Sequence, residues 1–272
     1  MGINATRALT CKYNAQLSCG RVQTPTLSII AHREEEIKGF KPEDYYCLRC
    51  STGSGNLRIT WTWQNEKNGS TRSFNKDFIT GLEKQLSKSP LKISEEHTSA
   101  KKTFSPGLYD LTELQRDANR RFGFSAKETL NIMQRLYENH KVLTYPRTDS
   151  RYIGQDIVPT IKERLKACCI GPYKTFISPI LKEPLRTNKT FVDDKKVSDH
   201  HAIIPTEEYV QPEHMTNEER KIYDLVVRRF ISVLSAPFEY EQTTMKASAC
   251  GQTFTAKGKI TLSAGWHKLY DT

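Results

Sequence analysis

The chain has 272 residues, of which 37% are hydrophobic and 26% charged, a composition typical of a folded protein of about two domains. Its formal net charge of +10 favours a polyanionic partner, most commonly nucleic acid, although a ribosomal factor or a membrane-surface protein would also be basic. No stretch is long and apolar enough to cross a bilayer and no signal peptide opens the chain, which argues against a membrane-spanning or secreted protein.

The seven cysteines are an odd number at irregular spacings, which indicates reduced thiols in a cytosolic protein. Cys47 and Cys50 have the spacing of half a zinc site, but no matching second half follows them, and Cys47 lies in a strand-like run. We therefore expect no metal site at these residues.

The first predicted element is a helix over residues 5–13, and the abrupt opening before it suggests a boundary inside a longer protein. Residues 18–26 follow, in which Gly20 permits a tight turn or the close approach of a ligand. Pro25 suits the first turn of the next helix, and a helix N-terminus preceded by Arg21 and hydroxyl groups could bind a phosphate. An ordinary capped loop would leave the same pattern.

The character of the sequence changes to β-strand near residue 40. Residues 45–48 and 57–63 are predicted strands, the second with alternating character, and the Gly-rich residues 53–56 between them predict a hairpin. Another strand is predicted over residues 90–99, where the β segment stops.

Two helices are predicted next. Apolar side chains at helical spacing predict the first over residues 111–122, and Gly123 ends it. Ser125 and Glu128 form a capping box at the start of the second helix. With the extended residues 141–145 behind them, these helices resemble a winged helix-turn-helix, which is a common DNA-binding unit and also a common way to pack helices.

Residues 143–152 gather a phenol, two guanidinium groups, hydroxyl groups and a carboxylate into one short stretch. Pro146 favours an extended Tyr145, so that the side chains of Tyr145 and Arg147 would leave the chain on the same face. A nearby cation favours the phenolate and can also hold phosphate oxygens, so this pair suits an attack on a phosphodiester. A surface hairpin with a packing tyrosine is the ordinary alternative.

The rest of the chain is predicted to hold two further helices and a second β segment. One helix covers residues 157–168, and the other begins at Thr216, whose side chain forms a capping box with Glu219. Between them, residues 198–206 include two adjacent histidines, which could donate to a phosphate, orient a carboxylate, bind a metal or fill a structural role. Strands return over residues 238–270, and we expect both β segments to share one sheet, with the helical part inserted between them.

Three motifs together point to a known family. Residues 18–24 match the S-x-G-R-V-Q-[ST] motif of type IA DNA topoisomerases, residues 144–150 match their T-Y-x-R-T-D-S motif, and residues 200–206 match their H-x-A-I-x-P-T motif. The motifs stand in the family's order, and the resemblance covers essentially the whole chain. It is closest to the bacterial topoisomerase III group.

The resemblance implies a role for each matched residue. Tyr145 would be the nucleophile that forms a phosphotyrosyl link to the 5′ end of a cut single strand, and Arg147 would steady the scissile phosphate. His200 and Asp149 would pair and contact the neighbouring phosphate. The implied catalytic residues are Tyr145, Arg147, His200 and Asp149, and the implied DNA-binding residues are Arg7, Ser18, Cys19, Gly20, Arg21, Val22, Gln23, Thr148 and Ser150.

The resemblance also implies a mixed α+β, multidomain fold that forms part of the family's ring. Residues 1–38 would belong to the domain that lines the single-strand groove, residues 39–99 and 238–272 to a β hinge domain, and residues 100–237 to an inserted helical domain of winged-helix type. The sequence does not match the family's N-terminal Toprim domain, whose acidic residues hold Mg²⁺, or the C-terminal remainder of the groove domain. We therefore expect a fragment that binds no metal by itself.

The implied function is that of an ATP-independent topoisomerase that cuts one DNA strand, passes another and reseals the first. It would act as a monomer on mainly single-stranded DNA in the cytoplasm at the nucleoid, with Mg²⁺ needed by the full-length enzyme. The fragment alone is expected to be inactive. A non-catalytic, basic winged-helix module is the alternative, and a tyrosine recombinase fits less well, since His200 and His201 are not followed by the arginine of an H-x-x-R motif.

Overall fold

The computed structural model describes residues 2–54 and 57–270. The chain divides into two compact units, the first made of Met1–Ser94 and Lys246–Ala256, and the second of Glu95–Met245 and Lys257–Thr272. The sequence-based division into three domains stays a prediction.

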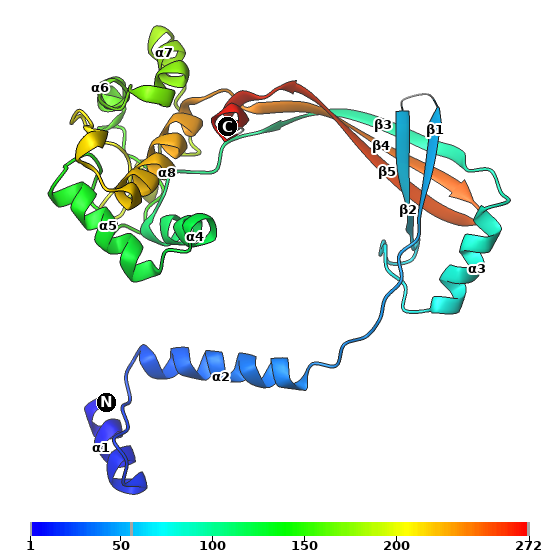
Figure 1. Ribbon diagram of the computed structural model, residues 1–272, viewed down its shortest axis with the longest axis horizontal. Coiled ribbons are helices and arrows are strands. Elements are labelled where there is room, and N and C mark those ends of the chain that lie inside the picture. The colour runs from blue at the N-terminus through cyan, green and yellow to red at the C-terminus, as the bar shows by residue number, and fades with distance from the viewer. Residues whose placement is uncertain (1, 55–56, 271–272) are drawn as a thin grey trace. The chain divides into compact units, whose positions relative to one another are not determined.

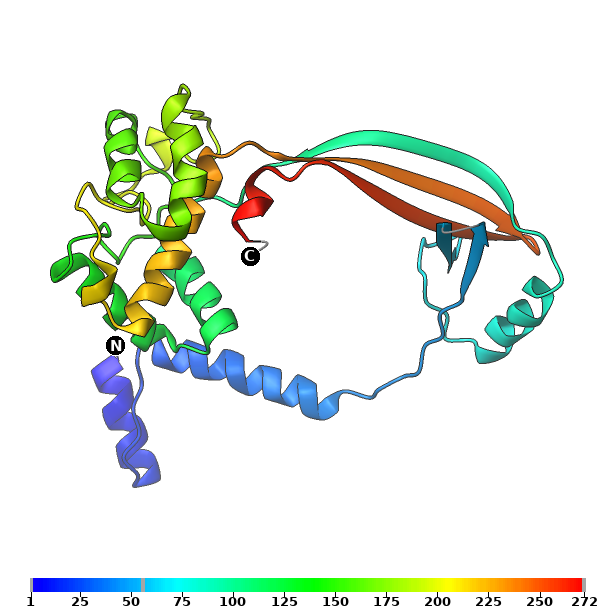
Figure 2. The same cartoon turned by 45° about the horizontal axis from the view of Figure 1, so that its top comes forward.

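The first unit begins with two helices, α1 (Gly2–Tyr13) and α2 (Gln23–Gly39), as expected for this stretch. The segment between them folds back along α1 (Figure 2), where the Thr6 hydroxyl accepts a hydrogen bond of 2.9 Å from the Cys19 N–H. In the described part of the chain, neither helix has a buried residue. Local hydrogen bonds to Thr6 and Thr10, and not a hydrophobic core, therefore hold residues 17–19 of this segment against α1.

A β-hairpin and a helix complete the first unit. Strands β1 (Arg49–Ser54) and β2 (Leu57–Gln64) pair antiparallel, and the turn expected between them lies outside the described residues. The first strand begins later than predicted, because Tyr46 makes only a single bridge, to Ser73. Helix α3 (Lys76–Leu86) was not predicted; it begins at Asn75, whose side chain accepts from the Phe78 N–H, and it buries Ile79 and Leu82.

The described strands form one antiparallel sheet in the order β1-β2-β5-β4-β3 (Figure 1). Strand β3 covers Lys92–Thr103, β4 covers Phe238–Ala249 and β5 covers Gln252–Ser263. In the first unit, β2 pairs with β5 through Trp63 and Phe254, both of which are buried. The two β segments therefore share one sheet, as the sequence predicted.

The second unit is built mainly from helices that pack around one hydrophobic core. Its two predicted capping boxes are present, with Ser125 and Glu128 at the start of α5, and Thr216 and Glu219 at the start of α8. Gly123 ends α4 with φ = +74°, a conformation that glycine adopts without strain. The α-helices of this unit are α4 (Leu111–Phe122), α5 (Ala126–Glu138), α6 (Ile161–Ala167), α7 (Lys174–Lys182) and α8 (Asn217–Leu234).

Short 3-10 turns lie between some of these helices, and a further one, Gly265–Leu269, follows β5. Helix α7 was not predicted. Helix α8 supplies the centre of the core, with Ile222, Val227 and Phe230 fully buried. Among the described residues, no helix has the length and apolar character needed to cross a membrane.

The expected winged helix-turn-helix is present only in part. Helices α4 and α5 pack against each other and against α8, as the Gly123 turn predicted. The segment behind α5 is not the extended strand that was expected, because Lys141 has φ = +56° and Leu143 makes only a single bridge, to Pro205. This bridge places the residue just before the 144–150 motif beside the 200–206 motif.

Candidate active site

Tyr145 is held in place by hydrogen bonds between the two motif segments of the second unit. The Thr144 N–H donates to the Ile204 carbonyl at 3.0 Å, and the Thr206 N–H donates to the Val142 carbonyl at 3.0 Å. Because these bonds involve the residues just before Tyr145, they fix the backbone that leads into it beside residues 204–206.

The phenol ring of Tyr145 is half-buried between two other rings. The His200 ring lies 4.3 Å from it, centroid to centroid, at a tilt of 40°, and the Tyr137 ring lies 5.6 Å away and nearly perpendicular. Packing against both rings restricts the rotation of the phenol. The structure thus brings the predicted nucleophile and His200 into contact.

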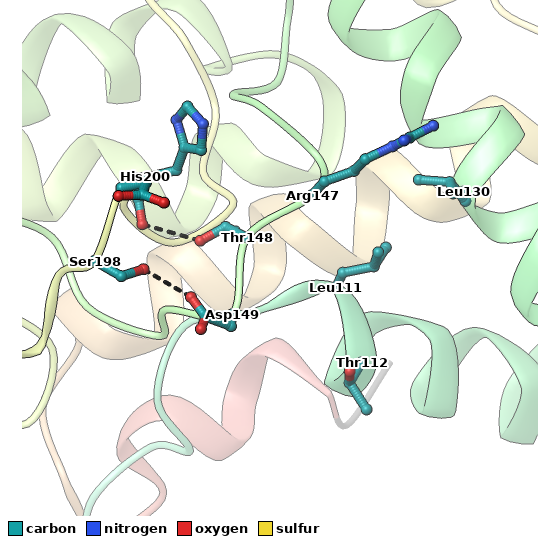
Figure 3. A pocket seen from close by; sticks show the side chains of 9 residues that line it. Leu111, Thr112, Leu130, Arg147, Thr148, Asp149, Ser198 and His200 are labelled. Atoms are coloured by element: carbon teal, nitrogen blue, oxygen red, sulfur yellow. Dashed lines mark hydrogen bonds between the residues drawn. The ribbon is translucent and has the colours of Figure 1, made fainter. Parts of the chain in front are cut away.

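Arg147 and Asp149 line a surface pocket of about 590 Å³ together with His200 and the N-terminal residues of α4 (Figure 3). Both side chains are exposed. Arg147 extends away from Asp149 toward the end of the pocket that Leu130 lines (Figure 3). An unburied guanidinium at the wall of an open pocket is free to meet a phosphate.

Asp149 and His200 line the same pocket, but the predicted pair between them is not formed among the described residues. Asp149 instead accepts a hydrogen bond of 2.7 Å from the Ser198 hydroxyl. Ser198 is therefore a site residue that sequence reasoning missed, although it stands only two positions before His200.

Thr148 and Ser150 lie between these residues, and their side chains are buried. The Thr148 hydroxyl donates to the His200 carbonyl at 3.0 Å, and the Ser150 hydroxyl donates to the Lys196 carbonyl at 2.9 Å. Both hydroxyls thus fix the two loops to each other. In this structure both hydroxyls have backbone partners, and the expected DNA-binding role of Thr148 and Ser150 stays a prediction.

A second, smaller pocket of about 230 Å³ opens beside Tyr145. His200, His201 and Asp156 line it with Tyr145, as does Gly154, where an added Cβ would collide with the Asp156 carboxylate. The sequence left the role of His201 open between phosphate donor, carboxylate orienter, metal ligand and structural residue, and it did not single out Asp156.

Arg164 is another residue that the sequence analysis missed. Its guanidinium is buried, donates to the Pro205 carbonyl at 2.8 Å and forms an ion pair with Glu207. Burial lowers the pKa of Arg164, and the charge of Glu207 opposes that shift. The only signal in the sequence is an arginine in a short helix, which does not distinguish a buried side chain from an exposed one.

The N-terminal motif lies in the first unit, at the start of α2. The Gly20 N–H donates to the Thr24 hydroxyl at 3.1 Å, and the side chains of Arg21, Val22 and Gln23 are exposed. Val22 occupies the N-cap position and has no side-chain atom that could accept from the first N–H groups of the helix. The Thr24 N–H donates to the Gly20 carbonyl at 3.3 Å and Pro25 has no N–H, so Arg21 is the main group here that could bind an anion.

The other residues predicted to bind DNA in this unit differ in accessibility. Arg7 on α1 and Ser18 are exposed, whereas Cys19 and Gly20 are half-buried. The Cys19 backbone is occupied by Thr6, so its contribution is to the shape of the loop.

Residues 2–54 and 57–270 contain no group of three or more histidine, cysteine, aspartate or glutamate side chains that could hold a metal ion. Within these ranges the side chains do not fit a Mg²⁺ site.

Comparisons with known proteins agree with the motifs. A family model described as DNA topoisomerase matches residues 1–272. A protein of Bacillus cereus named DNA topoisomerase 3 is 59% identical over 271 residues, which cover all of this chain and 37% of that protein, and its namesake from Bacillus subtilis is 54% identical over the same share. The full-length topoisomerase I of Thermotoga maritima has a similar structure, with a TM-score of 0.70 and 26% identity over all of this chain and 43% of that protein. The chain thus spans about 37% of the length of these curated relatives.

Proposed function

Since the chain belongs to the type IA family of DNA topoisomerases, we propose that it contributes the nucleophile of an enzyme that changes DNA topology. Tyr145 cleaves one strand and forms a phosphotyrosyl link to its 5′ end, another strand passes, and the break is resealed. The reaction needs no ATP, because the tyrosyl ester conserves the energy of the broken bond. The observation that carries the proposal is the placement of Tyr145 against His200, beside the pocket lined by Arg147.

The chemistry follows from the groups around Tyr145. A tyrosine has an ordinary pKa of about 10, so most of the phenol is protonated at neutral pH and its attack needs help. The Arg147 guanidinium binds two phosphate oxygens and offsets the charge that develops on them. A ring nitrogen of His200 donates to a neighbouring phosphate oxygen, and Asp149 lines the same pocket.

Mg²⁺ is proposed to act in the complete enzyme, bound by residues outside this chain. The described residues of this chain do not fit a site for the ion. The proposed place of action is the cytoplasm at the nucleoid, with the protein acting as a monomer.

The test is covalent trapping on a labelled single-stranded oligonucleotide with Mg²⁺, followed by denaturation. One sample contains this chain alone. The other contains an extended protein, in which these 272 residues are joined to the further sequence that the relatives carry outside the matched region. We expect an adduct only with the extended protein, because the relatives carry most of their length outside the matched region. An adduct with the chain alone would contradict this division of the active site.

A non-catalytic DNA-binding module is the second candidate. The packing of α4 and α5 across the Gly123 turn favours it, since such helix pairs commonly bind DNA. It predicts no adduct from either sample.

We expect Arg21→Ala to weaken binding of single-stranded DNA and to reduce its salt dependence. Each lost phosphate contact lowers the slope of log K against log salt concentration by about 0.7. The measurement is fluorescence anisotropy of a labelled oligonucleotide over a series of salt concentrations. Arg33→Ala is the matched control, because Arg33 is an exposed arginine on α2, the helix that follows Arg21, and forms an ion pair with Glu36. Equal losses in both variants would show that Arg21 has no specific contact.

A further inference from the structure

His201 is fixed beside the nucleophile by a shared hydrogen-bond acceptor. Its Nδ1 lies 2.7 Å from the Ala202 carbonyl oxygen, and the Thr144 hydroxyl donates to the same oxygen at 3.2 Å. Thr144 directly precedes Tyr145 in the chain. The imidazole is therefore held against the backbone that carries Tyr145.

The bond to Ala202 also sets the tautomer of His201. A carbonyl oxygen can only accept, so Nδ1 must carry the hydrogen and Nε2 keeps a free lone pair in the neutral ring. His201 thus presents a proton acceptor.

The surroundings of His201 favour its neutral form. Burial lowers the pKa of His201 below the ordinary value, and the charges of Arg164 and His200 act in the same direction. The bond to Ala202 and the charge of Asp156 oppose this shift without reversing it. The ring is therefore unprotonated, and able to accept a proton, at neutral pH.

His201 shares two pockets with Tyr145. One is the 230 Å³ pocket with Asp156 and His200, and the other is a pocket of about 590 Å³ that Tyr137 and Glu138 also line. As a class, carboxylates are weaker bases than an imidazole and accept a phenol proton less readily.

The other histidine is placed less suitably for this role. The His200 ring packs against the Tyr145 ring, with the centroids 4.3 Å apart, and the proposed function assigns His200 to a neighbouring phosphate oxygen. His201 is therefore the better candidate to receive the phenol proton.

We propose that His201 is the general base for Tyr145, an inference that rests on the proposed function. As the phenol oxygen bonds to phosphorus, the phenol proton moves to Nε2 of His201. The bond from phosphorus to the 3′ oxygen breaks, and that oxygen takes a proton from solvent water. On resealing, the 3′ hydroxyl loses its proton to water, and His201 returns a proton to the departing phenol oxygen.

The test measures the single-turnover rate of adduct formation by the extended protein between pH 5 and pH 9. His201→Asn keeps an N–H that can donate to Ala202 but has no basic nitrogen. We expect it to react about 100-fold more slowly at pH 7, with unchanged affinity for single-stranded DNA. The wild-type rate should fall as the pH drops through the pKa of His201, because the protonated ring cannot accept, and this fall should be absent in the variant.

The matched control is His214→Asn, which changes an exposed histidine of the same unit and should keep the wild-type rate and pH profile. His201→Gln and thermal unfolding of each variant separate a chemical effect from misfolding. If His201→Asn reacts slowly but keeps the wild-type pH profile, His201 is a structural residue and the proposal is overturned. An unchanged rate in His201→Asn would also overturn it. Absence of an adduct from the wild-type extended protein would overturn the proposed function itself.

Discussion

Replacing Tyr145 by phenylalanine is expected to abolish both the covalent DNA adduct and the relaxation of supercoiled plasmid by the extended protein. Phenylalanine keeps the ring that packs against Tyr137 and His200, so the fold of the site should be retained. It lacks the oxygen that attacks phosphorus, and no other group can form the same ester. Binding of single-stranded DNA should be unchanged, because the phosphate contacts come from other side chains.

The measurement compares trapped adduct, plasmid relaxation and DNA affinity for the two proteins. Tyr209→Phe is the control, since Tyr209 is a largely exposed tyrosine of the same unit, 70% accessible to solvent. A remaining adduct in Tyr145→Phe would assign the nucleophile to another residue. Activity left fully intact by the substitution would favour the view that this chain only binds DNA.

The sequence predicted the helices that begin with a recognisable capping pattern. Ser125 with Glu128 and Thr216 with Glu219 each place a hydroxyl and a carboxylate three residues apart, and both capping boxes formed. Helix α3 carries a similar signal in Asn75 that was overlooked. Helix α7 contains Pro179, and a proline inside a helix normally argues against that helix, so no local pattern predicts α7.

The motifs identified the candidate site residues but could not give their surroundings. Thr148 and Ser150 stand in the same motif as Arg147, yet their hydroxyls point into the protein and bond to carbonyls of another loop. Thr148 bonds to His200 and Ser150 bonds to Lys196, about fifty residues away in the sequence, so no local sequence pattern predicts these partners. The orientation of His201 likewise depends on a carbonyl that only the folded loop brings into place.

A buried ion pair between α4 and α8 gives the largest expected change in stability. Arg229 donates to Asp117 at 3.0 Å, with side chains only 9% and 13% exposed, and it also donates to the Gly107 carbonyl at 2.9 Å. The Tyr109 hydroxyl donates to Asp117 at 2.6 Å. Burial raises the pKa of Tyr109, so that this hydroxyl stays protonated and remains a donor.

Asp117→Ala is expected to lower the free energy of unfolding of this chain by about 3–5 kcal/mol, because it leaves the Arg229 charge buried without its partner. Urea unfolding followed by circular dichroism measures the loss. Replacing both residues, Asp117→Leu with Arg229→Met, should recover most of it, since well-packed apolar side chains leave no charge to desolvate. Glu113→Ala is the control on the same helix: Glu113 pairs with the exposed Arg116, and its loss should change the free energy by about 0–1 kcal/mol.

Asp117→Ala should also affect the candidate active site. The Tyr109 carbonyl accepts a hydrogen bond of 2.8 Å from the Ile203 N–H, two residues beyond His201. Loss of the ion pair would therefore loosen the loop that positions both histidines, and adduct formation by the extended protein should fall in Asp117→Ala and recover in the double variant. If Asp117→Ala destabilised the chain no more than Glu113→Ala, the ion pair would not anchor this loop, and Tyr145 would owe its placement to the loop contacts alone.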